Sequence, residues 1–249
     1  MSFFKLRQAA FAALLLAAAP AWAANDALTV GQKQEVREVV RQYLRENPEV
    51  LVEAIQTLQT RQEAKERERA EDNLSSLRSE LENDPSSPVG GNPNGDVTVV
   101  EFFDYRCGFC KSALPSIIEL LESDDKIRYV FREYPALGVE SVVAARAALA
   151  AWNIDREKYM SFHISLMESK GELSESKILG LAAKVGLNAK KLRAAMDAPG
   201  VEKAIKRNYE LGNELGISGT PVFIIGDKLT RGLMSLEDMK KAVAKARKG

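Results

Sequence analysis

The N-terminal part of the chain contains two short stretches in which apolar residues recur at helical spacing. Between Gly31 and Asn47 they fall at i, i+3, i+4 and i+7 and share one helix face: Val36, Val39, Val40, Tyr43 and Leu44. After Asn47 and Pro48, which suit an N-cap and a first helical position, a second stripe is formed by Leu51, Ala54, Ile55 and Leu58. The pattern predicts two amphipathic helices.

These two helices together span roughly 30 residues, and a fold below roughly 40 residues usually needs disulfides, metals or partner chains. Their apolar faces must therefore be covered by other parts of a protein. We predict that residues 24–58 form a helical oligomerisation segment that associates with copies of itself. The alternative is a monomer in which both helices fold back on the main domain.

A strongly charged stretch follows. Nine of the twelve residues from Arg61 to Asp72 are charged, and none is large and apolar. Such a stretch cannot pack in a core, so it is either a solvated helix or a segment that melts and re-forms easily. Leu74, Leu77 and Leu81 then return at helical spacing before Pro85. We interpret residues 59–85 as a charged helical linker.

Residues 86–249 show the pattern of an α/β domain. Val97 to Phe103 is almost uninterruptedly apolar, typical of a strand covered on both faces, and only Glu101 breaks it. A helix from Gly108 to Glu122 and a strand from Ile127 to Phe131 complete a predicted βαβ unit. Residues 139–215 are helical in pattern throughout. A strand from Thr220 to Ile225, a hairpin partner from Lys228 to Arg231 and a last helix from about Ser235 close the chain.

The first residues indicate export. Lys5 and Arg7 precede an apolar run over residues 9–19, and small residues at Ala21 and Ala23 suit a signal peptidase. A membrane anchor is the alternative, but this run is shorter than the about 20 residues that span a bilayer. We predict a signal peptide over residues 1–23 and a mature protein in the periplasm, where disulfides persist. The mature chain has 33 basic and 35 acidic residues, a balance that argues against nucleic-acid binding.

Cys107 and Cys110 are the only cysteines, and they lie three apart where the predicted strand gives way to a helix. Such a pair serves redox cycling or metal binding. Zinc usually needs four ligands, and with His163 as the only histidine one subunit cannot build a closed zinc site. Cu(I), which accepts two thiolates, stays open. A redox pair predicts thiol-disulfide exchange on the disulfides of other proteins.

Cys107 falls at the mouth of the helix, where unpaired main-chain N–H groups and the positive end of the helix dipole favour a thiolate. It is therefore the predicted nucleophile, and Cys110, one turn further in, is the predicted resolving thiol. Gly108 lets the chain turn closely, and Phe109 packs or touches substrate. We expect His163 on a helix surface or at a core edge, not as a ligand or a base.

The cysteine motif after a strand, Thr220-Pro221 opening a later strand, and the helical block between them resemble the thioredoxin fold in its DsbA-like form. With the N-terminal helices and the segment from Phe103 to Lys111, the chain is similar to the suppressor-of-copper-sensitivity C (ScsC) proteins, which are periplasmic DsbA-like oxidoreductases. The expected fold is a thioredoxin fold with an inserted helical domain. Gly108-Phe109 departs from DsbA, whose motif contains a histidine, so a strongly oxidising site is not expected.

The resemblance also implies roles for three residues. Pro221 matches a cis-proline that lies against the cysteine motif, and Thr220 would bind an extended substrate strand through its main chain. An ordinary trans proline at a strand start is the alternative. Glu101 matches a buried acid that helps to move a proton to or from Cys110. The alternative is a structural Glu101 held in a salt bridge.

Three functions remain open. The leading hypothesis is a disulfide isomerase or reductase that works as an oligomer, with no cofactor beyond the redox-active pair Cys107 and Cys110. The second is a monomeric oxidase that donates disulfides. The third is a Cu(I)-binding protein that uses the two thiolates. The resemblance favours a trimer, periplasmic clients with disulfides, and a membrane thiol-redox partner that resets the site.

Overall fold

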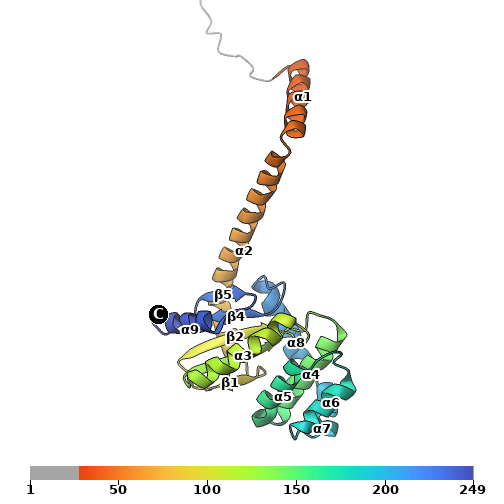
Figure 1. Cartoon of the computed structure of the whole chain (residues 1–249), viewed down its shortest axis with the longest axis vertical. Coiled ribbons are helices and arrows are strands. Elements are labelled where there is room, and N and C mark those ends of the chain that lie inside the picture. The colour runs from red at the N-terminus through yellow and green to blue at the C-terminus, as the bar shows by residue number, and fades with distance from the viewer. Residues whose placement is uncertain (1–27, 249) are drawn as a thin grey trace, which may run out of the picture. The chain divides into compact units, whose positions relative to one another are not determined.

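A computed structural model of the chain describes residues 28–248 (Figure 1). The signal peptide predicted for residues 1–23 and the first residues of the predicted oligomerisation segment lie outside the described residues. The chain divides into two compact units, residues 1–58 and residues 59–249. Among the described residues, none of the helices combines the length and the apolar character needed to cross a membrane.

The first unit contains α1 (Val30–Glu46) and the start of α2 (Glu49–Asn83), so both predicted helices are confirmed. Thr29 begins α1 with a capping box, in which its side chain accepts from the main chain of Gln32 and the Gln32 side chain accepts in return. Asn47 ends α1 by donating to the Tyr43 carbonyl. No residue of α1 is buried, and four of the five residues of the predicted apolar stripe are exposed, with Leu44 half-buried.

The second unit includes the C-terminal part of α2, which continues through the predicted charged linker to Asn83. Leu74 and Leu81 are 2% and 1% exposed and pack in a core of this unit. The fully buried Arg132 donates to the main-chain carbonyls of Glu80 and Leu81 and to the Asp84 carboxylate, and so satisfies the end of the helix. Part of α2 thus belongs to the second unit, ahead of residue 86, where we predicted the catalytic domain to begin.

The central sheet has five strands in the order β1-β3-β2-β4-β5. They are β1 (Val89–Gly91), β2 (Val97–Phe103), β3 (Ile127–Glu133), β4 (Val222–Ile225) and β5 (Lys228–Arg231). β2 and β3 are parallel and joined by α3 (Gly108–Ser123), which confirms the predicted βαβ unit; the other pairs are antiparallel. The sequence missed β1, because three residues that include two glycines carry no alternating pattern.

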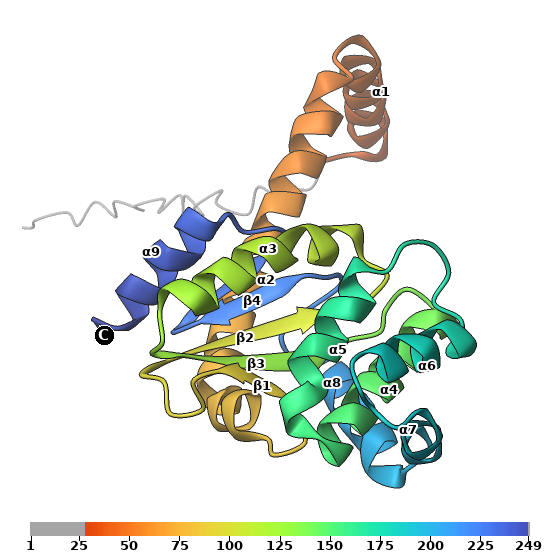
Figure 2. The same ribbon diagram turned by 60° about the horizontal axis from the view of Figure 1, so that its bottom comes forward.

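Both faces of the sheet are covered, as the apolar run in β2 predicts. Because side chains alternate along a strand, Val99 and Phe103 face one core while Val100 and Phe102 face another. α3 and α9 (Leu236–Ala246) cover the first face, and the end of α2 lies on the opposite face (Figure 2). Glu101 lies between Val99 and Phe103, so it belongs to the face that α3 covers.

The helical insertion contains α4 (Val139–Ile154), α5 (Arg156–Glu168), α6 (Glu175–Lys184), α7 (Ala189–Met196) and α8 (Pro199–Glu214). The side chains of Ser174 and Asn188 cap α6 and α7, and Ser235 caps α9. A run of buried alanines lets the other helices approach α4 closely. The thioredoxin fold with an inserted helical domain, predicted from the sequence, is confirmed.

Candidate active site

The two cysteines lie at the first turn of α3. Cys107 is the N-cap residue of this helix, in an extended conformation, and its carbonyl accepts a hydrogen bond from the Lys111 amide. Both cysteines are free thiols, 7% exposed for Cys107 and 1% exposed for Cys110. The outer sulfur thus belongs to Cys107 and the inner one to Cys110, in the order that the sequence predicts.

The second predicted motif lies against the first. The Thr220-Pro221 peptide bond is cis, as expected from the resemblance. The Cys107 thiol donates to the Thr220 carbonyl at 3.2 Å, although the two residues are 113 positions apart. Pro221 is buried, and its carbonyl accepts from the Gly232 amide at 2.8 Å. The start of β4 and the loop before α9 therefore form one wall of the site.

Glu101 is buried below the inner thiol and is 1% exposed. The Tyr129 hydroxyl donates to its Oε2 at 2.8 Å, and Oε1 has no hydrogen-bond partner. Burial raises the pKa of Glu101 to about 8, although the Tyr129 hydrogen bond opposes the rise. Burial first, and then the Glu101 charge, raises the pKa of the Cys110 thiol well above its ordinary value. Among the described residues Glu101 forms no salt bridge, and the Tyr129 hydroxyl is its hydrogen-bond partner.

Asp104 holds the loop that carries Cys107, a role that sequence reasoning missed. Its carboxylate is buried and accepts from three neutral donors: the Arg106 amide at 2.7 Å, the Leu137 amide at 2.9 Å and the Ser141 hydroxyl at 2.8 Å. Its carbonyl accepts from the Cys107 amide at 3.1 Å. A polar residue directly after an apolar strand was the signal in the sequence.

His163 is buried in the core at 1% exposure, so the prediction of a surface or core-edge position was wrong. Its Nδ1 lies 3.0 Å from the Tyr105 hydroxyl, which also donates to Glu133 at 3.0 Å. Burial lowers the pKa of His163 to about 3 and raises that of Glu133. The helical period of α5 could not reveal this burial, because the strand and loop that cover His163 come from a distant part of the sequence.

Exposed apolar side chains are carried by the segments that adjoin the cysteine motif. Phe109 is 65% exposed, the neighbouring loops add Leu137 and Leu233, and the start of α4 adds Val139. Leu137 is tied to the motif because its carbonyl accepts from Arg106 at 2.8 Å, and Leu233 follows Gly232, whose amide binds Pro221. Gly108 has open space around its α-carbon. We call Phe109, Leu137, Val139 and Leu233 the apolar rim.

Comparison with known proteins identifies two segments of the chain. A family model described as thioredoxin matches residues 82–245, and one described as the N-terminal domain of copper resistance protein ScsC matches residues 32–65. Disulfide bond formation protein D of Bacillus subtilis is 27% identical over 172 residues, which are 65% of this chain and 78% of that protein. The chain also matches sodium/proton antiporters, but it spans only about a quarter of their length.

Two solved structures are similar over most of their length. A thioredoxin-like oxidoreductase from Silicibacter pomeroyi is 44% identical, and the match covers 69% of this chain and 98% of that one, with a TM-score of 0.66. ScsC of Proteus mirabilis in a transitional conformation is 32% identical and covers 89% of this chain and 99% of that one, with a TM-score of 0.67. The chain therefore belongs to the thioredoxin-like family, as a thiol-disulfide oxidoreductase of ScsC and DsbA type.

Proposed function

We propose that this oxidoreductase is a protein-disulfide isomerase or reductase that works as an oligomer in the periplasm. The observation that carries the proposal is the unequal setting of the two sulfurs. Cys107 lies at the N-terminal end of α3, beside the Thr220 carbonyl and the apolar rim, whereas Cys110 is buried over Glu101. Such a pair suits one thiol that attacks and one that resolves.

The Cys107 thiolate attacks one sulfur of a client disulfide, forms a mixed disulfide and releases the other client sulfur as a thiolate. In reduction, the Cys110 thiolate then attacks Cys107, frees the second client sulfur and leaves a Cys107–Cys110 disulfide. In isomerisation, a client thiolate attacks the mixed disulfide instead, forms a new client disulfide and returns Cys107 as a thiolate. Isomerisation needs no net oxidant or reductant, whereas repeated reduction needs a membrane thiol-redox partner.

Glu101 is the proposed proton acceptor for Cys110. A thiol whose pKa is raised by burial cannot attack until a base removes its proton. A carboxyl with a pKa of about 8 is partly ionised at neutral pH and can return the proton when the disulfide is reduced again. Its free oxygen, Oε1, leaves one position for that proton.

The apolar rim and the Thr220 main chain fit an unfolded polypeptide as client. An extended client strand offers main-chain groups to Thr220, and its apolar side chains can cover Phe109 and Leu233, which are 65% and 51% exposed. A pure metal carrier needs neither feature. In this proposal the exposed Gly108 and Phe109 contact the client together with the Thr220 main chain, and the buried Pro221 holds that main chain in place.

The oligomeric part of the proposal rests on the first unit. The apolar faces of α1 and of the start of α2 are exposed, with Val39 and Leu58 at 67% and 65%. An unpartnered stripe of this kind is typical of a helix that associates with copies of itself. A trimer is the state that the resemblance favours, and it would bring several Cys107 sites to one client.

Two measurements test the proposal. The wild-type chain should reactivate scrambled ribonuclease, which requires isomerisation, and Cys107→Ser should abolish this activity while Cys110→Ser accumulates mixed disulfides. Sedimentation should show an oligomer that becomes a monomer when residues 24–72 are removed. Oxidation of reduced ribonuclease without reactivation of the scrambled form, by a chain that is monomeric in both cases, would favour a DsbA-type oxidase.

Cu(I) binding by Cys107 and Cys110 is the second candidate, because the family model that matches residues 32–65 is that of the N-terminal domain of a copper resistance protein. Within residues 28–248, no cluster of three or more His, Cys, Asp or Glu side chains could hold a metal ion, so the two thiolates would be the ligands. Anaerobic Cu(I) titration of the dithiol protein, followed by thiol reactivity, tests this candidate. Unchanged reactivity at one equivalent of Cu(I) would exclude it.

A further inference from the structure

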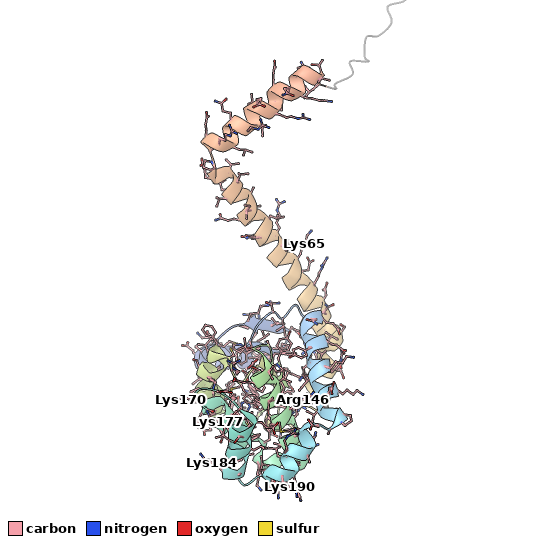
Figure 3. All side chains as sticks on the ribbon, turned by 90° about the vertical axis from the view of Figure 1, so that its right-hand side faces the viewer. Lys65, Arg146, Lys170, Lys177, Lys184 and Lys190 are labelled. Carbon is pink, nitrogen blue, oxygen red and sulfur yellow. The ribbon has the colours of Figure 1, made fainter. Side chains whose placement is uncertain are left out.

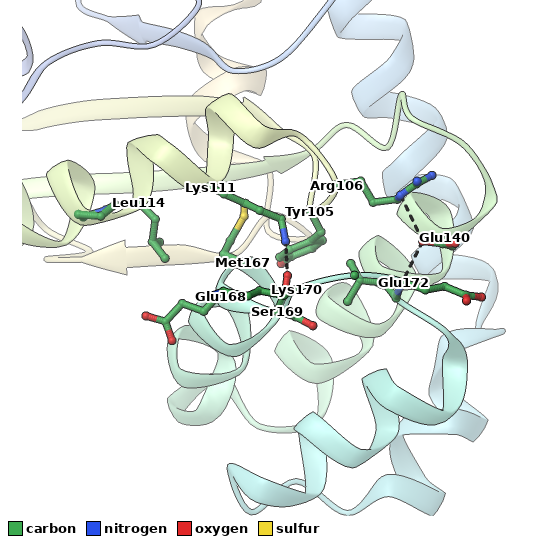
Figure 4. Close-up of a pocket in the computed structure, with 13 residues that line it drawn as sticks. Tyr105, Arg106, Lys111, Leu114, Glu140, Met167, Glu168, Ser169, Lys170 and Glu172 are labelled. Atoms are coloured by element: carbon green, nitrogen blue, oxygen red, sulfur yellow. Dashed lines mark hydrogen bonds and ion pairs between the residues drawn. The ribbon is translucent and has the colours of Figure 1, made fainter.

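A pocket of about 830 Å³ lies beside the cysteine motif, between the first turns of α3 and the segment that joins α5 to α6 (Figure 4). Arg106 and Lys111, which flank the motif, both line it. Met167 to Leu173 form the opposite wall. A client held at Cys107 therefore has this pocket next to it.

Lys111 places a positive charge in the pocket without a carboxylate partner among the ion pairs of the described residues. Its Nζ donates to the Ser169 carbonyl at 2.5 Å. Lys177 also donates to a main-chain carbonyl, that of Lys170. Burial first, and then the charge of Lys177, lowers the pKa of Lys111. Two ammonium groups thus repel each other here and have only neutral oxygens as partners.

The acidic residues around the pocket are directed elsewhere. Glu140 pairs with Arg106 at 3.2 Å and accepts from the Leu173 amide. Figure 4 shows Glu140 and Glu172 on the Arg106 side and the Glu168 carboxylate pointing away from Lys111. Asp104 attracts the Lys111 charge, but its carboxylate is already occupied by three donors. A carboxylate from outside would find the Lys111 ammonium group without competition.

Ser169 provides an independent sign of a ligand. It lines the same pocket, is 9% exposed, and its Oγ has no hydrogen-bond partner. A buried hydroxyl without a partner costs free energy, so it marks a position where an acceptor is missing. A carboxylate has two oxygens, one for the Lys111 ammonium and one for the Ser169 hydroxyl once the Ser169 side chain rotates from its buried position toward the pocket.

We propose that Lys111 and Ser169 form an acid subsite, which receives a Glu or Asp side chain lying within a few residues of the client cysteine. This subsite rests on the proposed function, because it requires a client polypeptide at Cys107. The acid subsite lets the enzyme prefer client disulfides that carry a negative side chain near the client cysteine. The apolar rim recognises clients without regard to that charge.

The test uses pairs of synthetic peptide disulfides that are identical except for Glu or Gln at one position within three residues of the cysteine. Reduction by the dithiol protein is followed by stopped flow at low and at high salt. At the best position we expect about a fivefold higher rate constant for the Glu peptide, the size of one partly exposed ion pair. High salt should reduce this preference, because ions screen the attraction.

Variants assign the preference to the subsite. Lys111→Met and, to a smaller extent, Ser169→Ala should remove it. The matched control is Lys190→Met, at an exposed lysine of α7 (Figure 3), which should keep it. Equal rates for Glu and Gln peptides at every position, or a preference that survives Lys111→Met, would overturn the subsite while leaving the proposed function intact. A wild-type chain that reduces neither peptide refutes the proposed function, and the subsite with it.

Discussion

The pKa of Glu101 can be read from the stability of the protein. We consider Glu101→Gln, which removes the titrating group and keeps its shape. Burial raises the pKa of Glu101 from its ordinary 4.5 to about 8, so the folded chain holds this proton more tightly than the unfolded chain. As the pH rises from 4.5 to 8, the unfolded chain loses the proton first. The contribution of Glu101 to folding is therefore complete at low pH and is lost over this window.

At about 1.36 kcal/mol per pKa unit, this loss reaches about 5 kcal/mol in total, of which about 4 kcal/mol falls between pH 5 and pH 9. The Gln variant lacks this loss. Its amide hydrogens face the position where Oε1 has no partner, which costs about 1–3 kcal/mol at every pH. The slope of the difference with pH, not its value at one pH, thus reports the pKa.

Urea unfolding of the dithiol forms of both proteins at several pH values supplies the measurement. Ionisation of the two thiols in the unfolded chain is common to both proteins and cancels in the difference. Glu101→Gln should gain about 4 kcal/mol over wild type between pH 5 and pH 9. Glu119→Gln, at an exposed position of α3, is the matched control for removal of one carboxylate. Parallel curves for Glu101→Gln and wild type would show that Glu101 titrates normally and would refute the reasoning.

Three further variants test other parts of the structure. Asp104→Ala leaves three donors without their acceptor and should cost about 2–4 kcal/mol of unfolding free energy, with slower exchange at Cys107; a loss within 0.5 kcal/mol would contradict the role of Asp104 in holding the loop. Arg132→Met should cost about 3–5 kcal/mol, because the partly buried Asp84 carboxylate and the Glu80 and Leu81 carbonyls at the end of α2 all lose their donor. Arg78→Met, which breaks a surface pair, should cost under about 1 kcal/mol. If both variants lost the same unfolding free energy, docking of α2 through Arg132 would be contradicted. His163→Gln should make the unfolding free energy less sensitive to acid. The pKa of His163 falls from 6.5 to about 3 on folding, so wild type loses stability as the pH drops through this range. An unchanged dependence of the unfolding free energy on pH would contradict burial of a neutral ring.

Much of the fold follows from local patterns. The apolar run from Val97 to Phe103, the helical stripes of α1 and α2, and the last helix expected from about Ser235 predict elements that the structure contains. These signals are short in range, because a helix or a strand imposes its period on consecutive residues. The strand-to-helix position of the cysteine pair is local in the same sense.

The environment of each functional group required the tertiary structure. The resemblance implies a buried Glu101, but only Tyr129 and the covering α3 decide how far its pKa rises. The burial of His163, the docking of α2 through Arg132, and the pocket at Lys111 each depend on segments distant in sequence. Desolvation and charge pairing act through space, so a sequence period can name the face of an element but not the group that will cover it. The sequence alone thus determined the elements and the identity of the reactive pair, whereas tertiary packing decided which groups tune that pair.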